Sequence, residues 1–242
     1  MLQRFKKIIK KLIFSYRSDS ESYVEYLRRG GAEIGERVRI FDPRGTVIDA
    51  TRPFMIKIGD DVQIASGVTM LTHGYDWSVI KGQYGEVLGS CGEIVIGNNC
   101  FIGMNTTILK GVHIGNNCII GANSLVNKDI PDGYVAAGNP AKPIVTVEEY
   151  RKKRLDAQLA EASELYRCYV TRVGKEPAIE LFDEFFWLFQ KRDENALTEG
   201  EKSKMRLVGN YEQSLARYLE TEPMFDGYEE FLKALKECMN RS

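Results

Sequence analysis

The chain has 242 residues, and 33 basic against 34 acidic residues give a formal net charge of -1. This balance excludes a global attraction to nucleic acid, and a hydrophobic content of 43% is typical of a folded domain. No apolar run reaches the roughly 18 residues that a membrane-spanning helix needs. The five cysteines form no CxxC pair and are odd in number, which argues against a zinc ribbon and a disulfide scaffold. We therefore predict a reducing, cytoplasmic location.

Residues 1–17 form a basic segment that carries six Lys or Arg residues and no acid. Its apolar residues recur at helical spacing, which predicts an amphipathic helix. Lysines interrupt every apolar stretch, so the segment lacks the hydrophobic region of a secretory signal. We expect this helix to pack on the protein itself; the alternative is a weak contact with an anionic membrane surface at the inner membrane face. With a second, capping helix it makes up a predicted N-terminal region, residues 1–30.

The middle of the chain repeats every six residues. An aliphatic residue opens each unit and a small residue commonly follows it, as at Ile96, Ile102, Ile108, Ile114, Ile120 and Val126. The same register appears upstream at Ile34, Ile40, Ile58, Ile64 and Met70. Neither the helical period of 3.6 nor the strand period of 2 explains a period of six. We interpret the repeat as a chain wound into coils that bury their apolar residues by stacking on one another.

Each position of the six-residue unit has a predicted place. The first residue and the fifth, which is small or aliphatic, point inward, and the glycine after the first suits a corner or a close backbone approach. Cys100 and Cys118 lie three units apart, so they are expected to stack as inert core residues. The repeat is interrupted between Ile40 and Ile58 and again over residues 74–93.

Three motifs within and after the repeat resemble those of the hexapeptide-repeat acyltransferases. They are His73-Gly74-Tyr75-Asp76-Trp77, Asn127-Lys128-Asp129-Ile130-Pro131 and Ala136-Ala137-Gly138-Asn139-Pro140-Ala141-Lys142. The sequence is most similar to the maltose and galactoside, xenobiotic, and capsule or O-antigen sugar O-acetyltransferases. The resemblance implies a mainly β fold, a left-handed parallel β-helix over residues 31–145. It also implies a homotrimer with active sites between subunits, acetyl-CoA as co-substrate, and no metal.

His73 is the candidate general base. Acyl transfer to a hydroxyl needs a group that removes its proton, and imidazole titrates near neutral pH. The chain has two histidines. His73 stands at the foot of the interruption over residues 74–93, where it can face a cleft, and it matches the catalytic histidine of the resembled family. His113 lies in an unbroken unit and is predicted to be an exposed corner or face residue.

The acceptor site is predicted around His73, with Asp49, Tyr75, Asp76 and Trp77 as its binding residues. Tyr75, Asp76 and a backbone carbonyl are candidates to orient the imidazole, and the resemblance places Asp49 near the acceptor. Aromatic rings suit the apolar face of a sugar. The alternatives are a solvated surface position for the two acids and packing against a neighbouring subunit for the two rings.

The resemblance also implies a groove for acetyl-CoA. Its lining is predicted to be Phe101, Gly103, Met104, Gly121, Ala122, Asn127, Lys128 and Lys142. The two lysines supply cations for the phosphates of the coenzyme, with plain solvated lysines as the alternative. Phe101 stands where the family often has tryptophan, beside the thioester end.

Residues 146–242 form a predicted α-helical appendage that the motifs do not explain. Thr146 with Glu149 predicts a capping box and a charged helix to about Arg172. Pro177 predicts a second helix, apolar nearly all round as far as Phe189, which should be buried or meet a partner. Two further helix starts are predicted by the pairs Thr198 with Glu201 and Asp226 with Glu229.

The predicted function is therefore acetyl transfer from acetyl-CoA to a hydroxyl of a sugar or polysaccharide precursor. The alternatives are an N-acetyltransferase that acts on an amino sugar and a non-catalytic trimeric scaffold. A metal hydratase on the same fold would need three histidine ligands per site, and the two histidines of this chain have no ligand spacing. The predicted partners are copies of the chain and a carbohydrate, with no nucleic acid.

Overall fold

The structure is a computed structural model that describes residues 13–241. The chain divides into two compact units, which we call the coil unit, up to Tyr150, and the helical unit, from Arg151 onward. The predicted helix and membrane contact over residues 1–17 fall mostly outside the described residues. None of the described helices is long and apolar enough to cross a membrane.

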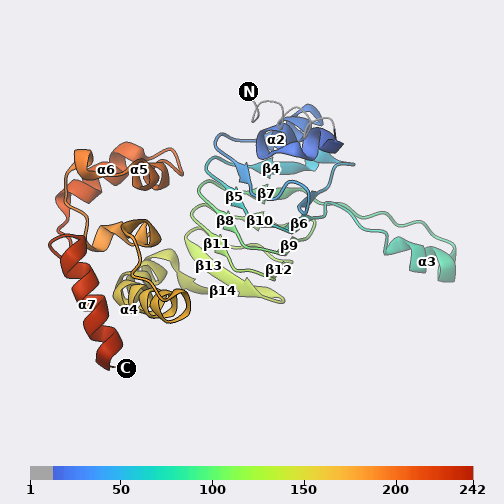
Figure 1. Ribbon diagram of the computed structural model, residues 1–242. Coiled ribbons are helices and arrows are strands. Elements are labelled where there is room, and N and C mark those ends of the chain that lie inside the picture. The colour runs from blue at the N-terminus through green and yellow to red at the C-terminus, as the bar shows by residue number, and fades with distance from the viewer. Residues whose placement is uncertain (1–12, 242) are drawn as a thin grey trace. The chain divides into compact units, whose positions relative to one another are not determined.

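The coil unit has three sides built from short strands (Figure 1). Side A holds β1 (Glu33–Ile34), β4 (Ile56–Ile58), β7 (Ile94–Ile96) and β10 (His113–Ile114). Side B holds β2 (Arg39–Ile40), β5 (Gln63–Ile64), β8 (Phe101–Ile102), β11 (Ile119–Ile120), β13 (Tyr134–Gly138) and β14 (Ala141–Thr146). Side C holds β3 (Val47–Ile48), β6 (Thr69–Met70), β9 (Thr107–Ile108) and β12 (Leu125–Val126). Successive strands from β1 to β12 visit the three sides in turn, so the chain coils.

Adjacent turns of the coil pair in parallel and in the predicted register. Ile102 lies beside Ile120, and Ile96 lies beside Ile114. The predicted interior is confirmed, because the first residues of the units and the fifth residues from Val62 to Ser124 are buried. Cys100 and Cys118 are both buried and precede the paired strands β8 and β11, so they stack as predicted.

The second and fourth residues of the unit form the corners. A Cβ atom on Gly103 would lie 2.6 Å from the backbone nitrogen of Ala122, which confirms the predicted close approach. The left-handed backbone occurs at the fourth residue, as at Asn99 and Asn117, with φ of 53° and 55°. Asparagine tolerates this conformation better than most residues, and Asn99 Nδ2 also donates to Asn117 Oδ1 at 2.8 Å.

Both ends of the coil are covered. At the N-terminal end, η1 (Ser15–Ser18) leads into α2 (Ser20–Arg29), whose buried residues Tyr23, Val24 and Leu27 join the coil core. The carboxylate of Asp19 caps α2 by accepting the backbone N–H of Ser22 at 2.8 Å. At the other end, β14 turns back antiparallel to β13 and closes side B.

The interruption after β6 is an arm, residues 74–90, that projects from the coil (Figure 1). Its foot is closed by an antiparallel bridge between His73 and Cys91 and by a hydrogen bond from Gly92 N to Thr72 O at 2.9 Å. The arm contains α3 (Trp77–Tyr84), which the sequence analysis did not predict. The shorter interruption contains β3 and η2 (Pro53–Met55).

The appendage begins with the predicted capping box. Glu149 N donates to Thr146 Oγ1, and Thr146 N donates to Glu149 Oε2, so α4 (Val147–Val173) starts and ends as predicted. The helical unit continues with η5 (Glu194–Ala196), α5 (Glu199–Met205), α6 (Tyr211–Glu220) and α7 (Tyr228–Arg241).

The predicted helix from Pro177 is wrong. The chain forms two short 3₁₀ turns instead, η3 (Ile179–Phe182) and η4 (Phe186–Leu188). Aromatic residues favour a helix less than Ala or Leu does. Here their rings reach different neighbours: Phe186 packs on Tyr218, and Phe189 stacks on Phe231. The predicted burial of the segment is confirmed for Phe182, Phe186, Leu188 and Phe189.

The two further helix starts are confirmed with one change. Thr198 and Glu201 form the capping box of α5. At α7, Glu230, one residue beyond the predicted Glu229, accepts from the backbone N–H of Asp226. The sequence analysis missed α6, whose N-cap residue Asn210 makes no side-chain capping bond.

Candidate functional site

The imidazole of His73 is held by Asp49. The distance from His73 Nδ1 to Asp49 Oδ2 is 2.7 Å, and the side chains are 16% and 4% exposed. Because a carboxylate can only accept, Nδ1 carries the proton and the Nε2 lone pair stays free. The sequence left open which group orients the imidazole. In the structure this group is Asp49, and not Tyr75, Asp76 or a backbone carbonyl.

Asp49 reaches His73 because β3 and β6 are in register. Val47 pairs with Thr69 and Ile48 with Met70, and Asp49 N donates to Met70 O at 3.1 Å. Asp49 and His73 thus leave adjacent strands of side C at the same edge of the coil. We call this the His73 edge, formed by the residues that follow β3, β6, β9 and β12.

Two threonines that the sequence analysis missed complete the surroundings of Asp49. Thr72 Oγ1 donates to Oδ2, the oxygen that also faces His73. Thr51 donates to Oδ1 through its hydroxyl at 2.7 Å and its backbone N–H at 3.0 Å. Neither threonine occupies a repeat position that predicts this role, so only the fold brings them to the carboxylate.

These contacts fix the charge of Asp49. Burial alone would raise the pKa of its carboxyl group. The hydrogen bonds from Thr72, Thr51 and His73 outweigh this effect and hold the pKa far below its usual value of 3.8. The carboxylate of Asp49 therefore stays ionised at neutral pH.

The other predicted acceptor residues lie on the arm beside His73. The Tyr75 ring meets the His73 ring edge-on at 5.6 Å between centroids, and Trp77 lies 6.0 Å from Tyr75. Tyr75 is 71% exposed, so its face is open to a ligand. Asp76 is exposed and folds back over Gly74, where an added Cβ would lie 2.5 Å from its Oδ1 atom.

Lys110 joins the foot of the arm from the next turn of the coil. Its Nζ atom donates to Ser90 Oγ at 2.5 Å and would lie 3.8 Å from a Cβ atom on Gly74. This lysine was not predicted, because the count from Ile108 gives it an ordinary third position in an unbroken unit. His113, by contrast, is exposed on side A as predicted.

The predicted coenzyme residues divide between different edges. Five of them lie in or directly after β8 and β11, on neighbouring turns: Phe101, Gly103, Met104, Gly121 and Ala122. We call this edge the Phe101 edge. Their contact is direct, because Gly103 N donates to Ile120 O at 2.8 Å. Phe101 and Met104 are 43% and 52% exposed, which gives this edge an apolar surface.

The remaining three lie elsewhere. Asn127 and Lys128 follow β12 and so belong to the His73 edge, where Leu109 N donates to Val126 O at 3.0 Å. Lys142 lies in β14, opposite Ala137 of β13. Both lysines are exposed, as a role in holding phosphate requires.

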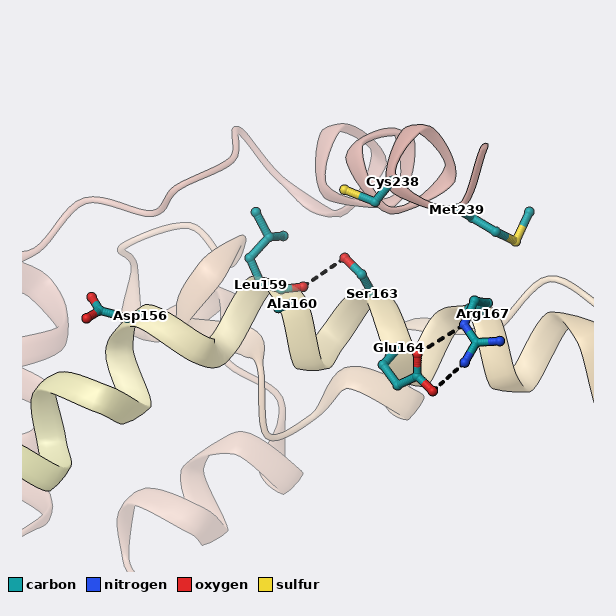
Figure 2. Close-up of a pocket in the computed structure, with 8 residues that line it drawn as sticks. All are labelled: Asp156, Leu159, Ala160, Ser163, Glu164, Arg167, Cys238 and Met239. Carbon is teal, nitrogen blue, oxygen red and sulfur yellow. Dashed lines mark hydrogen bonds and ion pairs between the residues drawn. The ribbon is translucent and has the colours of Figure 1, made fainter. Parts of the chain in front are cut away.

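Other hollows lie in the helical unit. One, of about 580 Å³, lies between α4 and α7, with Leu159, Ser163, Cys238 and Met239 among its lining (Figure 2). It contains no histidine, and Glu164 and Arg167 within it pair with each other. Among the described residues, no three His, Cys, Asp or Glu side chains are grouped so that they would hold a metal ion.

Comparison with known proteins identifies similar chains. Residues 93–128 match the family described as bacterial transferase hexapeptide (six repeats). Protein CapG of Staphylococcus aureus is 43% identical over 130 residues, which are 54% of this chain and 74% of CapG. The galactoside O-acetyltransferase of Escherichia coli (strain K12) is 39% identical over 107 residues, 44% of this chain and 50% of that enzyme. A solved galactoside acetyltransferase in complex with coenzyme A matches at 26% identity and a TM-score of 0.43, over 62% of this chain and 84% of that one.

Proposed function

Since this chain belongs to the bacterial hexapeptide-repeat transferases and is an acyltransferase with acetyl-CoA as co-substrate, we propose that it acetylates a sugar hydroxyl with His73 as general base. The observation that carries the proposal is the 2.7 Å contact between His73 Nδ1 and Asp49 Oδ2. It leaves Nε2 as the basic atom, in a side chain that is 16% exposed.

The proposed reaction is direct transfer. His73 Nε2 accepts the proton of the sugar hydroxyl as its oxygen attacks the thioester carbonyl. The tetrahedral intermediate then collapses, the C–S bond breaks, and the imidazolium returns the proton to the sulfur of coenzyme A. Asp49 stabilises the imidazolium between these steps, because its carboxylate stays charged. We assign Asp49 to this role rather than to direct contact with the acceptor.

The acceptor is proposed to be a carbohydrate, as in a polysaccharide precursor. Tyr75 and Trp77 support this class, because exposed rings beside the base can stack on the apolar face of a sugar. The galactoside O-acetyltransferase among the relatives also supports it. Transfer to the amine of an amino sugar is the alternative, and the cytoplasmic location stays a prediction.

We further propose that the coil is left-handed and that three copies associate, with each active site between two copies. This arrangement is supported by the fact that the predicted site residues lie on two different edges of one chain. The base lies on the His73 edge, whereas the apolar coenzyme residues lie on the Phe101 edge of the same chain. A site between subunits would bring the His73 edge of one copy to the Phe101 edge of another. Lys128 and Lys142 are proposed to meet the coenzyme phosphates.

The proposal is tested by turnover of purified protein with acetyl-CoA and a panel of mono- and disaccharides, with release of the coenzyme thiol as the readout. We expect His73→Ala to lower kcat by a factor on the order of 10² to 10⁴, the usual share of a general base, without changing the oligomer. His113→Ala is the matched control and should retain full activity. Full turnover by His73→Ala would refute the mechanism.

The product distinguishes the alternatives. An O-acetyl ester is cleaved by alkaline hydroxylamine, whereas an N-acetyl amide survives it. If no sugar is acetylated and calorimetry detects no binding of coenzyme A, the non-catalytic scaffold is favoured instead.

A further inference from the structure

We propose that Thr72 and Thr51 are positioning residues that hold the Asp49 carboxylate as the acceptor for His73 Nδ1. The inference rests on the proposed function, because it concerns how the base of that reaction is oriented. The two threonines contact neither a substrate nor the reacting nitrogen, so they act through Asp49.

The geometry divides the donors between the two carboxylate oxygens. Oδ1 accepts both bonds from Thr51, and Oδ2 accepts from Thr72 Oγ1 and His73 Nδ1, with a longer bond of 3.4 Å from Thr72 N. A carboxylate has about four lone-pair sites, so these donors fill it. Asp49 can therefore neither rotate nor take up a proton without losing a hydrogen bond.

The position of each threonine fits this role. Thr72 is fully buried and directly precedes His73, so its hydroxyl and the imidazole share one oxygen from adjacent residues. Thr51 lies on the turn that follows β3, two residues after Asp49. Within residues 13–241, neither hydroxyl donates to another partner, since each is directed at the carboxylate.

Thr72 and His73 share Asp49 Oδ2, and this leads to a prediction that a purely structural role of Thr72 would not. Loss of the Thr72 hydroxyl leaves Oδ2 with only the longer bond from Thr72 N beside His73, so the carboxylate can turn and the imidazole is no longer held in one tautomer. The other titratable groups near the ring are Tyr75 and Asp76 on the arm, Cys91 across the bridge, and Lys110 from the next turn. All of them are unchanged by a substitution at Thr72, so Asp49 is the source of a change in tautomer.

The test is NMR of the two histidine rings in full-length protein labelled with ¹⁵N-histidine, with His113→Gln used for assignment. In the neutral ring the ¹⁵N shifts report which nitrogen carries the proton, and we expect one tautomer of His73 in the wild type and a mixture in Thr72→Val. Thr72→Ser should match the wild type, because it restores the hydroxyl. Thr106→Val is the matched control: Thr106 is equally buried, but its hydroxyl donates to Gly121 O at 3.1 Å, away from the site.

An unchanged tautomer ratio of His73 in Thr72→Val, or identical behaviour of Thr72→Val and Thr72→Ser, overturns the proposal. If Thr72→Val does not fold, the exposed Thr51 is used for the test. Thr51→Val should change the tautomer ratio in the same direction and Thr51→Ser should not, and no change in Thr51→Val overturns the proposal.

Kinetics add a second readout. Once an acceptor is known, Thr72→Val should lower kcat roughly 10-fold and leave KM for acetyl-CoA unchanged. The NMR measurement needs no acceptor and no turnover. If wild-type protein transfers no acetyl group, or if His73→Ala remains active, the proposed function fails while the tautomer ratio still decides the role of the threonines.

Discussion

Asp49 and His73 lie 24 residues apart in the sequence, yet Asp49 Oδ2 is 2.7 Å from His73 Nδ1. The coil brings them together because one full turn and one interruption separate β3 from β6. The proposed base and the group that orients it thus follow two adjacent strands of one side.

Asp49→Asn tests the orientation of the base. The amide can donate to Nδ1 and so favours the wrong imidazole tautomer, with the proton on Nε2. We expect kcat to fall by about 10² to 10⁴ with little change in KM for acetyl-CoA, measured by steady-state kinetics. Asp132→Asn removes an exposed carboxylate that accepts from Asn116, and serves as the control. Equal activity of the two variants would contradict the assigned role of Asp49.

Asp49 also makes stability depend on pH. Its folded-state pKa lies below the ordinary value of 3.8, so its contribution is fully present above that value and is lost as the pH falls through the folded-state pKa. Below about pH 5, the difference in free energy of unfolding between wild type and Asp49→Asn should shrink as the pH falls through about 4. Urea unfolding at a series of pH values measures this difference. A difference that grows with acid would have the wrong sign.

Gly103→Ala tests the spacing of the turns. The added Cβ atom would lie 2.6 Å from both Ala122 N and Ile120 O, backbone atoms that cannot move independently of the coil. We expect a loss of about 1–3 kcal/mol in stability, read as a lower Tm in a thermal melt. Gly82→Ala in α3 is the control, because no atom lies within 4 Å of its added Cβ. Equal Tm values for the two variants would contradict the close approach.

A complementation experiment tests the site between subunits. His73→Ala and Phe101→Arg each disable one edge, and each variant alone should be nearly inactive. When the two are co-expressed, some interfaces combine the intact His73 edge of one copy with the intact Phe101 edge of the other. We expect activity to recover to a measurable fraction of wild type, assayed on the mixed oligomer isolated through two different tags. No recovery, although mixed oligomers form, would place each site within a single chain.

Much of the coil could be predicted from the period of six. The period fixes which residues point inward, and it identified His73 because that residue stands where the count breaks. The same count could not reveal the role of Asp49, which lies inside an interrupted stretch where the register from Ile40 is lost. Only the pairing of β3 with β6 restores it.

The helical unit was less predictable for a different reason. Capping pairs mark helix starts by local chemistry, and those at Thr146 and Thr198 were found correctly. The segment after Pro177 has no such local determinant. Its conformation depends on rings that reach Tyr218 and Phe231, far along the chain, and a local pattern does not contain those contacts.

The elements at the two ends of the coil have a consequence for how the protein unfolds. In a stack where each turn touches only its neighbours, fraying starts at whichever terminus is least protected and then runs inward. α2 packs on one end of the coil, and the β13–β14 hairpin pairs with the last turn at the other end. We therefore expect the lifetime of the folded protein to depend on how tightly these two elements are attached, even though Asp49 and His73 lie between them.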